Sequence, residues 1–152
     1  MDAEVNYILS LLEQKEETSI SALTFYKGLY KGSEIIVSKS GIGKVNMAIT
    51  ITTLILNFNP DLIINSGCAG SVKEKIGTVC LANRIGYHDY YMPDEEYFYD
   101  FPKKESFNKA INIIGKDVKI GTFLTGDQFI ESIDVIKQAP LDDVLAIAME
   151  SM

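Results

Sequence analysis

Apolar runs that end in small or polar residues alternate along this chain with segments of helical periodicity. The clearest run, Val144–Ala148, predicts a buried strand, and Met149 and Glu150 follow it directly. Alternation of this kind predicts an α/β fold with a mostly parallel sheet, in which ligands bind at the carboxyl ends of the strands. Glu150 is therefore either a functional carboxylate at such an edge or a solvated charge near the chain end.

Periodicity and turn residues predict the remaining elements. The predicted helices span residues 2 to about 15, 44–57, 106–114 and 130–138. The predicted strands span 23–30 and 34–38, which form a hairpin, and then 62–64, 78–87 and 118–124. The helix at 44–57 is expected to be largely buried, and residues 90–102 are expected to be irregular. Glu13, Glu16 and Glu17 are expected to lie on a solvated helix end.

The composition argues against several classes of protein. A chain of 152 residues with 47% hydrophobic and 23% charged residues is expected to form a single globular domain, 1–152. Its formal net charge of −7 argues against a nucleic-acid surface, and no apolar stretch is long enough to span a membrane. Cys68 and Cys80 lack metal-ligand spacing and His88 is the only histidine. We therefore expect a cytoplasmic protein without a metal site, a nucleic-acid partner or a membrane partner.

Three glycine-containing loops follow predicted strands, and we expect all three at one edge of one sheet. The loop at 40–44 lacks the phosphate-loop signature, because Val45 follows Lys44 where that signature needs Ser or Thr. The loop at 65–70 consists of small residues that let backbone N–H groups approach a ligand. The loop at 125–130 places Phe129 past a strand end, where it is either part of the core or a stacking face for a planar base.

Five segments together resemble the bacterial 5′-methylthioadenosine/S-adenosylhomocysteine nucleosidases, the hydrolytic branch of the purine nucleoside phosphorylase fold. These segments are 40–46, 63–70, 87–89, 125–130 and 149–150, in the family's order and spacing. The resemblance implies a mixed, mostly parallel central sheet flanked by helices. It also implies hydrolysis of the N-ribosidic bond to release adenine, in methionine salvage, by a homodimer without a cofactor. The family's first strand and everything after residue 152 have no counterpart in the sequence.

The resemblance implies a role for each matched residue near the sugar and the base. Glu4 matches the carboxylate that activates the attacking water, and Glu150 matches the carboxylate that bonds the ribose hydroxyls. Met149 is expected to pack against the sugar. Phe129 is expected to stack on adenine, while the backbone of Ile130 reads the edge of the base.

Further positions match the rest of the family's substrate pocket. Cys68 stands where the family usually has Ser near the ribose, and Ala69 and Gly70 continue that loop under the base. Met92 falls where an apolar residue lines the 5′-alkylthio pocket.

Two positions match residues through which one subunit of the homodimer completes the other's pocket. Ile42 and Tyr97 fall where the partner subunit closes that pocket. The family's general-acid Asp would lie past residue 152, so the resemblance implies that this chain alone is inactive. A non-catalytic remnant or half of a split enzyme is therefore one alternative function.

A phosphorylase is the other alternative, and Asn65 argues against it. Phosphorylases of this fold resemble one another in having Arg at this position, where it can hold the phosphate anion. Here the loop offers only the neutral amide of Asn65. Water is therefore the favoured acceptor of the sugar.

Overall fold

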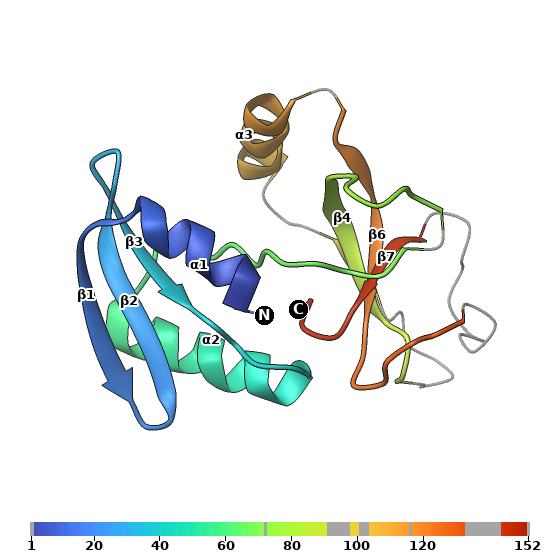
Figure 1. Cartoon of the computed structure of the whole chain (residues 1–152). Coiled ribbons are helices and arrows are strands. Elements are labelled where there is room, and N and C mark those ends of the chain that lie inside the picture. The colour runs from blue at the N-terminus through green and yellow to red at the C-terminus, as the bar shows by residue number, and fades with distance from the viewer. Residues whose placement is uncertain are drawn as a thin grey trace. The chain divides into compact units, whose positions relative to one another are not determined.

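The structure, a computed structural model, describes residues 2–71, 73–90, 98–100, 104–115, 117–132 and 144–151. The chain divides into two compact units, Met1–Cys68 and Ala69–Met152. Both units contain helices and strands, and the predicted mixed α/β fold is confirmed (Figure 1). Whether residues 1–152 form a single domain stays a prediction.

The first unit is built on a three-stranded antiparallel sheet in the order β1-β2-β3. Its elements are α1 (Asp2–Leu11), β1 (Glu13–Ile20), β2 (Leu23–Tyr30), β3 (Ser33–Ser38) and α2 (Lys44–Phe58). The predicted hairpin is confirmed, since Tyr30 pairs with Ser33 across a two-residue loop. Lys31 and Gly32 both have positive φ, at 51° and 80°, which suits the twist of the two strands.

The predicted helix at residues 2–15 is too long. α1 ends at Leu11, and β1 carries Glu13, Glu16 and Glu17, which were expected on a helix end. Residues 13–19 are all exposed, so this strand has no apolar alternation from which it could have been predicted. Backbone pairing with β2 holds it in place instead.

α2 is confirmed as a helix, but the prediction that it is largely buried is wrong. It ends at Asn59, which has a φ of 46° and donates its backbone N–H to the carbonyl oxygen of Ile55 at 3.0 Å. One face of the helix packs on the sheet through Phe58, whose ring lies 5.2 Å from that of Phe25. Leu56 lies on the other side of the helix and is 79% exposed, so the sheet of this unit does not cover that side.

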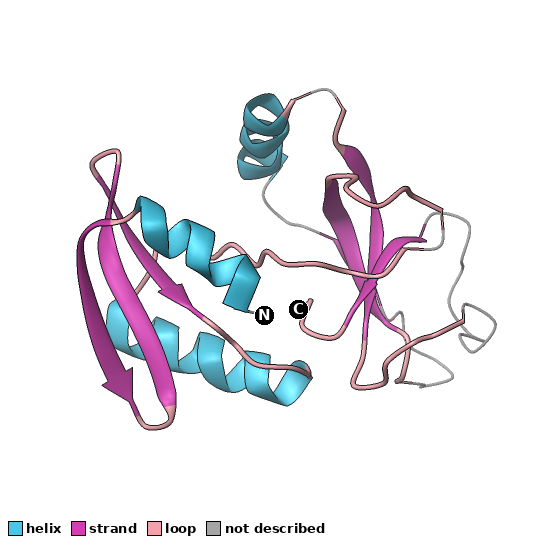
Figure 2. Cartoon of the chain, in the orientation of Figure 1, coloured by secondary structure: helices cyan, strands magenta, loops and turns pink. Residues whose placement is uncertain are grey.

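The second unit is built on a four-stranded sheet in the order β5-β4-β6-β7 (Figure 2). Its elements are β4 (Cys80–Tyr87), β5 (Phe98–Asp100), α3 (Lys104–Ile114), β6 (Lys119–Thr125) and β7 (Val144–Ala148). β4, β6 and β7 run parallel and β5 is antiparallel, so the predicted mostly parallel sheet is confirmed. Leu124 and Val144 are buried at its centre, with Phe98, Ile130 and Ile147 packed against them.

Three further predictions differ from the structure. Residues 62–64 form no strand, and Ile64 is 78% exposed, because no strand of the described residues pairs with this segment. Residues 130–132 are not helical, and 133–138 lie outside the described residues. The region 90–102 was expected to be irregular, but the short strand β5 lies within it.

None of the helices in the described ranges is both long and apolar enough to cross a bilayer.

The buried position of Leu124 gives a test of the second unit's core. Leu124 is fully buried, so Leu124→Ala should lower the free energy of unfolding by about 2–5 kcal/mol through lost contacts and a residual cavity. Ile76 is fully exposed, and Ile76→Ala removes the same number of atoms, so it should change stability by only about 0.5 kcal/mol. Urea denaturation of both variants measures the difference, and equal effects would contradict this core assignment.

Candidate active site

Glu4 lies in the first turn of α1 and contacts a loop more than sixty residues later in the chain. Its carboxylate oxygen Oε1 accepts a hydrogen bond from the backbone N–H of Cys68 at 2.8 Å. A Cβ atom at Gly67 would lie only 3.3 Å from the same oxygen, so the lack of a side chain there permits the approach. The structure therefore brings together two predicted site residues, Glu4 and Cys68.

The start of α1 is fixed by an ion pair as well. Lys39 directly follows β3, and its Nζ lies 2.7 Å from the carboxylate of Asp2, the first residue of α1. A hydrogen bond with the chain's amino terminus, and after it the bond from Cys68 N–H, lower the pKa of Glu4 from its ordinary value. Because the pKa is lowered, Glu4 remains a carboxylate throughout the neutral range, which is the form that a general base requires.

The carboxyl ends of the three parallel strands lie in one row. Tyr87 pairs with Thr125, and Thr125 pairs with Ala148, so β4, β6 and β7 end at the same level. The segments that follow therefore leave the sheet at a common edge, as predicted for the loop at 125–130 and for Glu150. The loop at 40–44 belongs to the first unit, so its expected place at this edge stays a prediction.

The loop at 125–130 exposes its aromatic residue. Phe129 is 74% exposed, so it is not part of the core, and its role as a stacking face stays a prediction. Ile130 is half-buried and packs against Leu124 and Val144. The backbone N–H of Asp127 donates to the carboxylate of Asp89 at 2.7 Å. This last contact was missed from sequence, although both residues directly follow the ends of neighbouring strands.

Met149 and Glu150 form a bend directly after β7, and both are half-buried. The backbone N–H of Met149 donates to the Glu150 carboxylate oxygen Oε2 at 3.3 Å. Gly70 pairs with Ile147 through two backbone hydrogen bonds of 2.9 and 2.8 Å. Ala69, which precedes Gly70, is exposed. The end of the 65–70 loop therefore runs beside β7, and the Met149–Glu150 bend directly follows that strand.

For three other predicted site residues, a position at this edge stays a prediction. Ile42 lies in the first unit, directly before α2, and is 69% exposed. Met92 and Tyr97 lie outside the described residues. No group of three His, Cys, Asp or Glu side chains in the described part of the chain could hold a metal ion.

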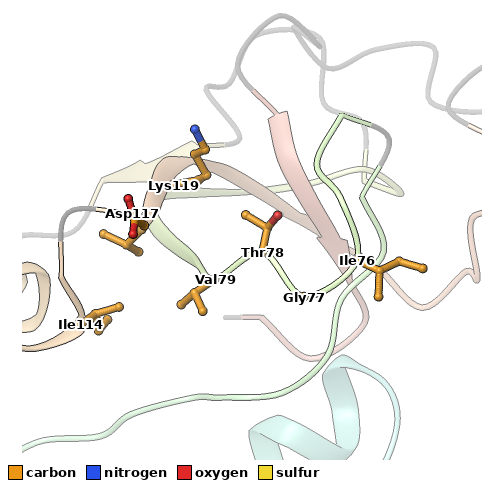
Figure 3. A pocket seen from close by; sticks show the side chains of 8 residues that line it. Ile76, Gly77, Thr78, Val79, Ile114, Asp117 and Lys119 are labelled. Atoms are coloured by element: carbon orange, nitrogen blue, oxygen red, sulfur yellow. The ribbon is translucent and has the colours of Figure 1, made fainter.

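A cavity of about 530 Å³ lies elsewhere in the second unit (Figure 3). Its lining residues are Ile76, Gly77, Thr78, Val79, Ile114, Asp117, Val118 and Lys119. These residues precede β4 and β6 or begin them, so the cavity lies at the amino ends of the strands. Parallel sheets bind ligands at the other end. We therefore place the candidate site at the carboxyl edge and not in this cavity.

Known proteins resemble the chain over its whole length. Residues 1–152 match the family model described as Phosphorylase superfamily. A 5′-methylthioadenosine/S-adenosylhomocysteine nucleosidase of Staphylococcus aureus is 33% identical over 168 aligned residues, covering 99% of this chain and 73% of the relative.

Solved structures agree with these sequence matches. An S-adenosylhomocysteine nucleosidase from Streptococcus pyogenes, in complex with 5-methylthiotubericidin, has a TM-score of 0.84 at 31% identity and covers 98% of this chain and 70% of that one. A Helicobacter pylori MTAN mutant with 5′-methylthioadenosine in its active site has a TM-score of 0.83 at 30% identity, covering 99% of this chain and 72% of that one. The predicted family is confirmed: the chain belongs to the phosphorylase superfamily and, within it, to the 5′-methylthioadenosine/S-adenosylhomocysteine nucleosidases.

Proposed function

We propose that the chain hydrolyses the N-ribosidic bond of 5′-methylthioadenosine and S-adenosylhomocysteine and releases adenine. The observation that carries the proposal is the Glu4 carboxylate, which Cys68 N–H holds at 2.8 Å beside Gly67. A carboxylate fixed against a loop of small residues is suited to activate a water next to a sugar. The relatives named above support the substrate class, and the same family membership supports a cytoplasmic role in methionine salvage.

In the proposed reaction, water attacks the anomeric carbon of the ribose while the bond from that carbon to the purine breaks. The electron pair of the broken bond leaves with adenine, which takes up a proton from solvent on a ring nitrogen. Glu4 accepts the proton that the attacking water loses. The carboxylate of Glu150 accepts hydrogen bonds from the ribose hydroxyls and lies near the positive charge that develops on the sugar. Phe129 supplies a face on which the base stacks.

Asn65 bears on the choice between water and phosphate as the acceptor. It is exposed at the start of the 65–70 loop, and its side chain carries no charge with which to attract an anion. Hydrolysis is therefore favoured over phosphorolysis, in keeping with the names of the relatives. The relatives do not favour the alternative of a remnant without catalysis.

Turnover gives the direct test of this proposal. We expect methylthioadenosine to yield adenine at the same rate with and without phosphate, in the chain extended by a relative's C-terminal segment that carries the general-acid Asp. Glu4→Gln and Glu150→Gln should each lower kcat by about 10²–10⁴, because a base or a charge near the sugar is lost.

Two surface substitutions control for the change of Glu to Gln. Glu17 lies exposed on β1 and Glu105 lies exposed on α3, so Glu17→Gln and Glu105→Gln should leave turnover unchanged. A requirement for phosphate, with ribose 1-phosphate analogues as the product, would show that the chain is a phosphorylase.

Binding gives a test that does not depend on turnover. Adenine should bind more tightly than ATP, NAD or free phosphate, because Phe129 offers a stacking face and the loops lack phosphate signatures. Phe129→Ala should weaken adenine binding by about fivefold to 100-fold, the range expected for loss of one stacked base, while Phe129→Tyr keeps the aromatic face. Isothermal titration calorimetry measures each dissociation constant, and tight binding of NAD without adenine binding would oppose the proposal.

A homodimer is the second part of the proposal, and α2 supports it. Val45, Ile49 and Leu56 are spaced to share one face of this helix, and they are 66%, 53% and 79% exposed. Ile42, two residues before the helix, is 69% exposed. Exposed apolar side chains that share a helix face are suited to an interface, and the resemblance implies that a second copy of the chain lies near Ile42.

Substitution on this face of α2 should prevent the dimer. Ile49→Glu places a charge at the centre of the exposed stripe and should give a monomer in sedimentation velocity, whereas the unchanged chain sediments as a dimer. Ile113→Glu is the matched control, because Ile113 is 85% exposed on α3 and lies away from α2 in sequence. A dimer that survives Ile49→Glu would exclude this face as the interface.

A further inference from the structure

The loop that carries Phe129 is held at both ends and exposed between them. At its start, the backbone N–H of Asp127 donates to the Asp89 oxygen Oδ2 at 2.7 Å. At its end, Ile130 packs against the buried core of the second unit. Phe129 itself is 74% exposed, so packing around its own ring does not fix it. The position of the ring therefore depends on the two attachments of the loop.

The start of the loop contacts the residues that follow β4. The backbone N–H of His88 donates to the carbonyl oxygen of Thr125 at 3.0 Å and so continues the pairing of β4 with β6 by one residue. A Cβ atom at Gly126 would lie 2.5 Å from His88 Nε2 and 2.7 Å from Asp89 Cγ, closer than real contacts. A side chain at 126 would therefore displace the side chains of His88 and Asp89, which occupy the space that it would need.

We propose that Asp89 is a positioning residue for the adenine-stacking loop. It acts through the Asp127 N–H and holds the loop in the conformation that presents Phe129 to the base. A hydrogen bond to a carboxylate is stronger than one between neutral groups, so it can restrain a loop whose aromatic residue is mostly exposed. A loop that is already ordered loses less entropy when the base binds. The inference rests on the proposed function, because that function assigns Phe129 its role.

Restraint of the loop can be measured without any ligand. The chain has no Trp, so Phe129→Trp introduces a single reporter at the tip of the loop. Asp89→Ala in this background should increase the amplitude of fast motion in time-resolved fluorescence anisotropy. Asp89→Asn keeps an acceptor oxygen and should restore most of the restraint. Asp61→Ala, at an exposed position of the first unit, should have no effect. Equal anisotropy decays in all four proteins would overturn the proposal.

Adenine binding gives the second readout, in proteins that keep Phe at position 129. Asp89→Ala should weaken adenine binding about fivefold, the factor expected from loss of a typical net hydrogen bond, and Asp89→Asn should recover most of it. Gly126→Ala tests the same attachment independently, because its added methyl group must displace His88 and Asp89. Thermal unfolding followed by circular dichroism shows that each variant is folded. If Asp89→Ala does not fold, Gly126→Ala decides the question.

The two readouts separate this inference from the proposed function. If the unchanged chain fails to bind adenine while Asp89→Ala still frees the reporter, the role of Phe129 is wrong and the restraint by Asp89 is supported. If the unchanged chain binds adenine and neither Asp89→Ala nor Gly126→Ala alters binding or anisotropy, Asp89 has no positioning role.

Discussion

Parallel pairing of β4, β6 and β7 is the constraint on which the candidate purine site depends. Because Tyr87, Thr125 and Ala148 pair in one row, the residues after each strand leave the sheet at the same edge. Segments that are far apart in sequence thereby come close together at this edge. The hydrogen bond from Asp127 N–H to Asp89 is a direct result, and it joins the ends of two neighbouring strands.

The carboxylate of Glu4, the proposed base, depends on a different constraint, within the first unit. Glu4 is held by the start of α1, which the ion pair between Asp2 and Lys39 ties to the end of β3. The backbone of Gly67 and Cys68 then passes against its carboxylate. An acid placed on a rigid helix and bonded by a backbone N–H keeps its orientation with few freely rotating groups. This arrangement is suited to a reaction in which one water must be positioned against a sugar.

The elements that the sequence predicts well are those whose side chains show which face is buried. The strand at Val144–Ala148 and the hairpin are of this kind, while α2 was predicted from its periodicity and from Asn59, which marks its end. β1 could not be predicted, because residues 13–19 are all exposed and show no apolar alternation, while its backbone pairs with β2. The burial of α2 was overestimated. Periodicity shows that one face of a helix is apolar, but it does not show what covers that face.

The central claim is that adenine binds at the carboxyl edge of β4, β6 and β7, and NMR titration of the ¹⁵N-labelled chain tests it most directly. Adenine should shift the backbone amide signals of residues 126–130 and 149–150. The signals of Gly77, Val79 and Lys119, which line the cavity at the amino ends of the strands, should stay in place. Shifts confined to those cavity residues, with none at 126–130, would contradict the account.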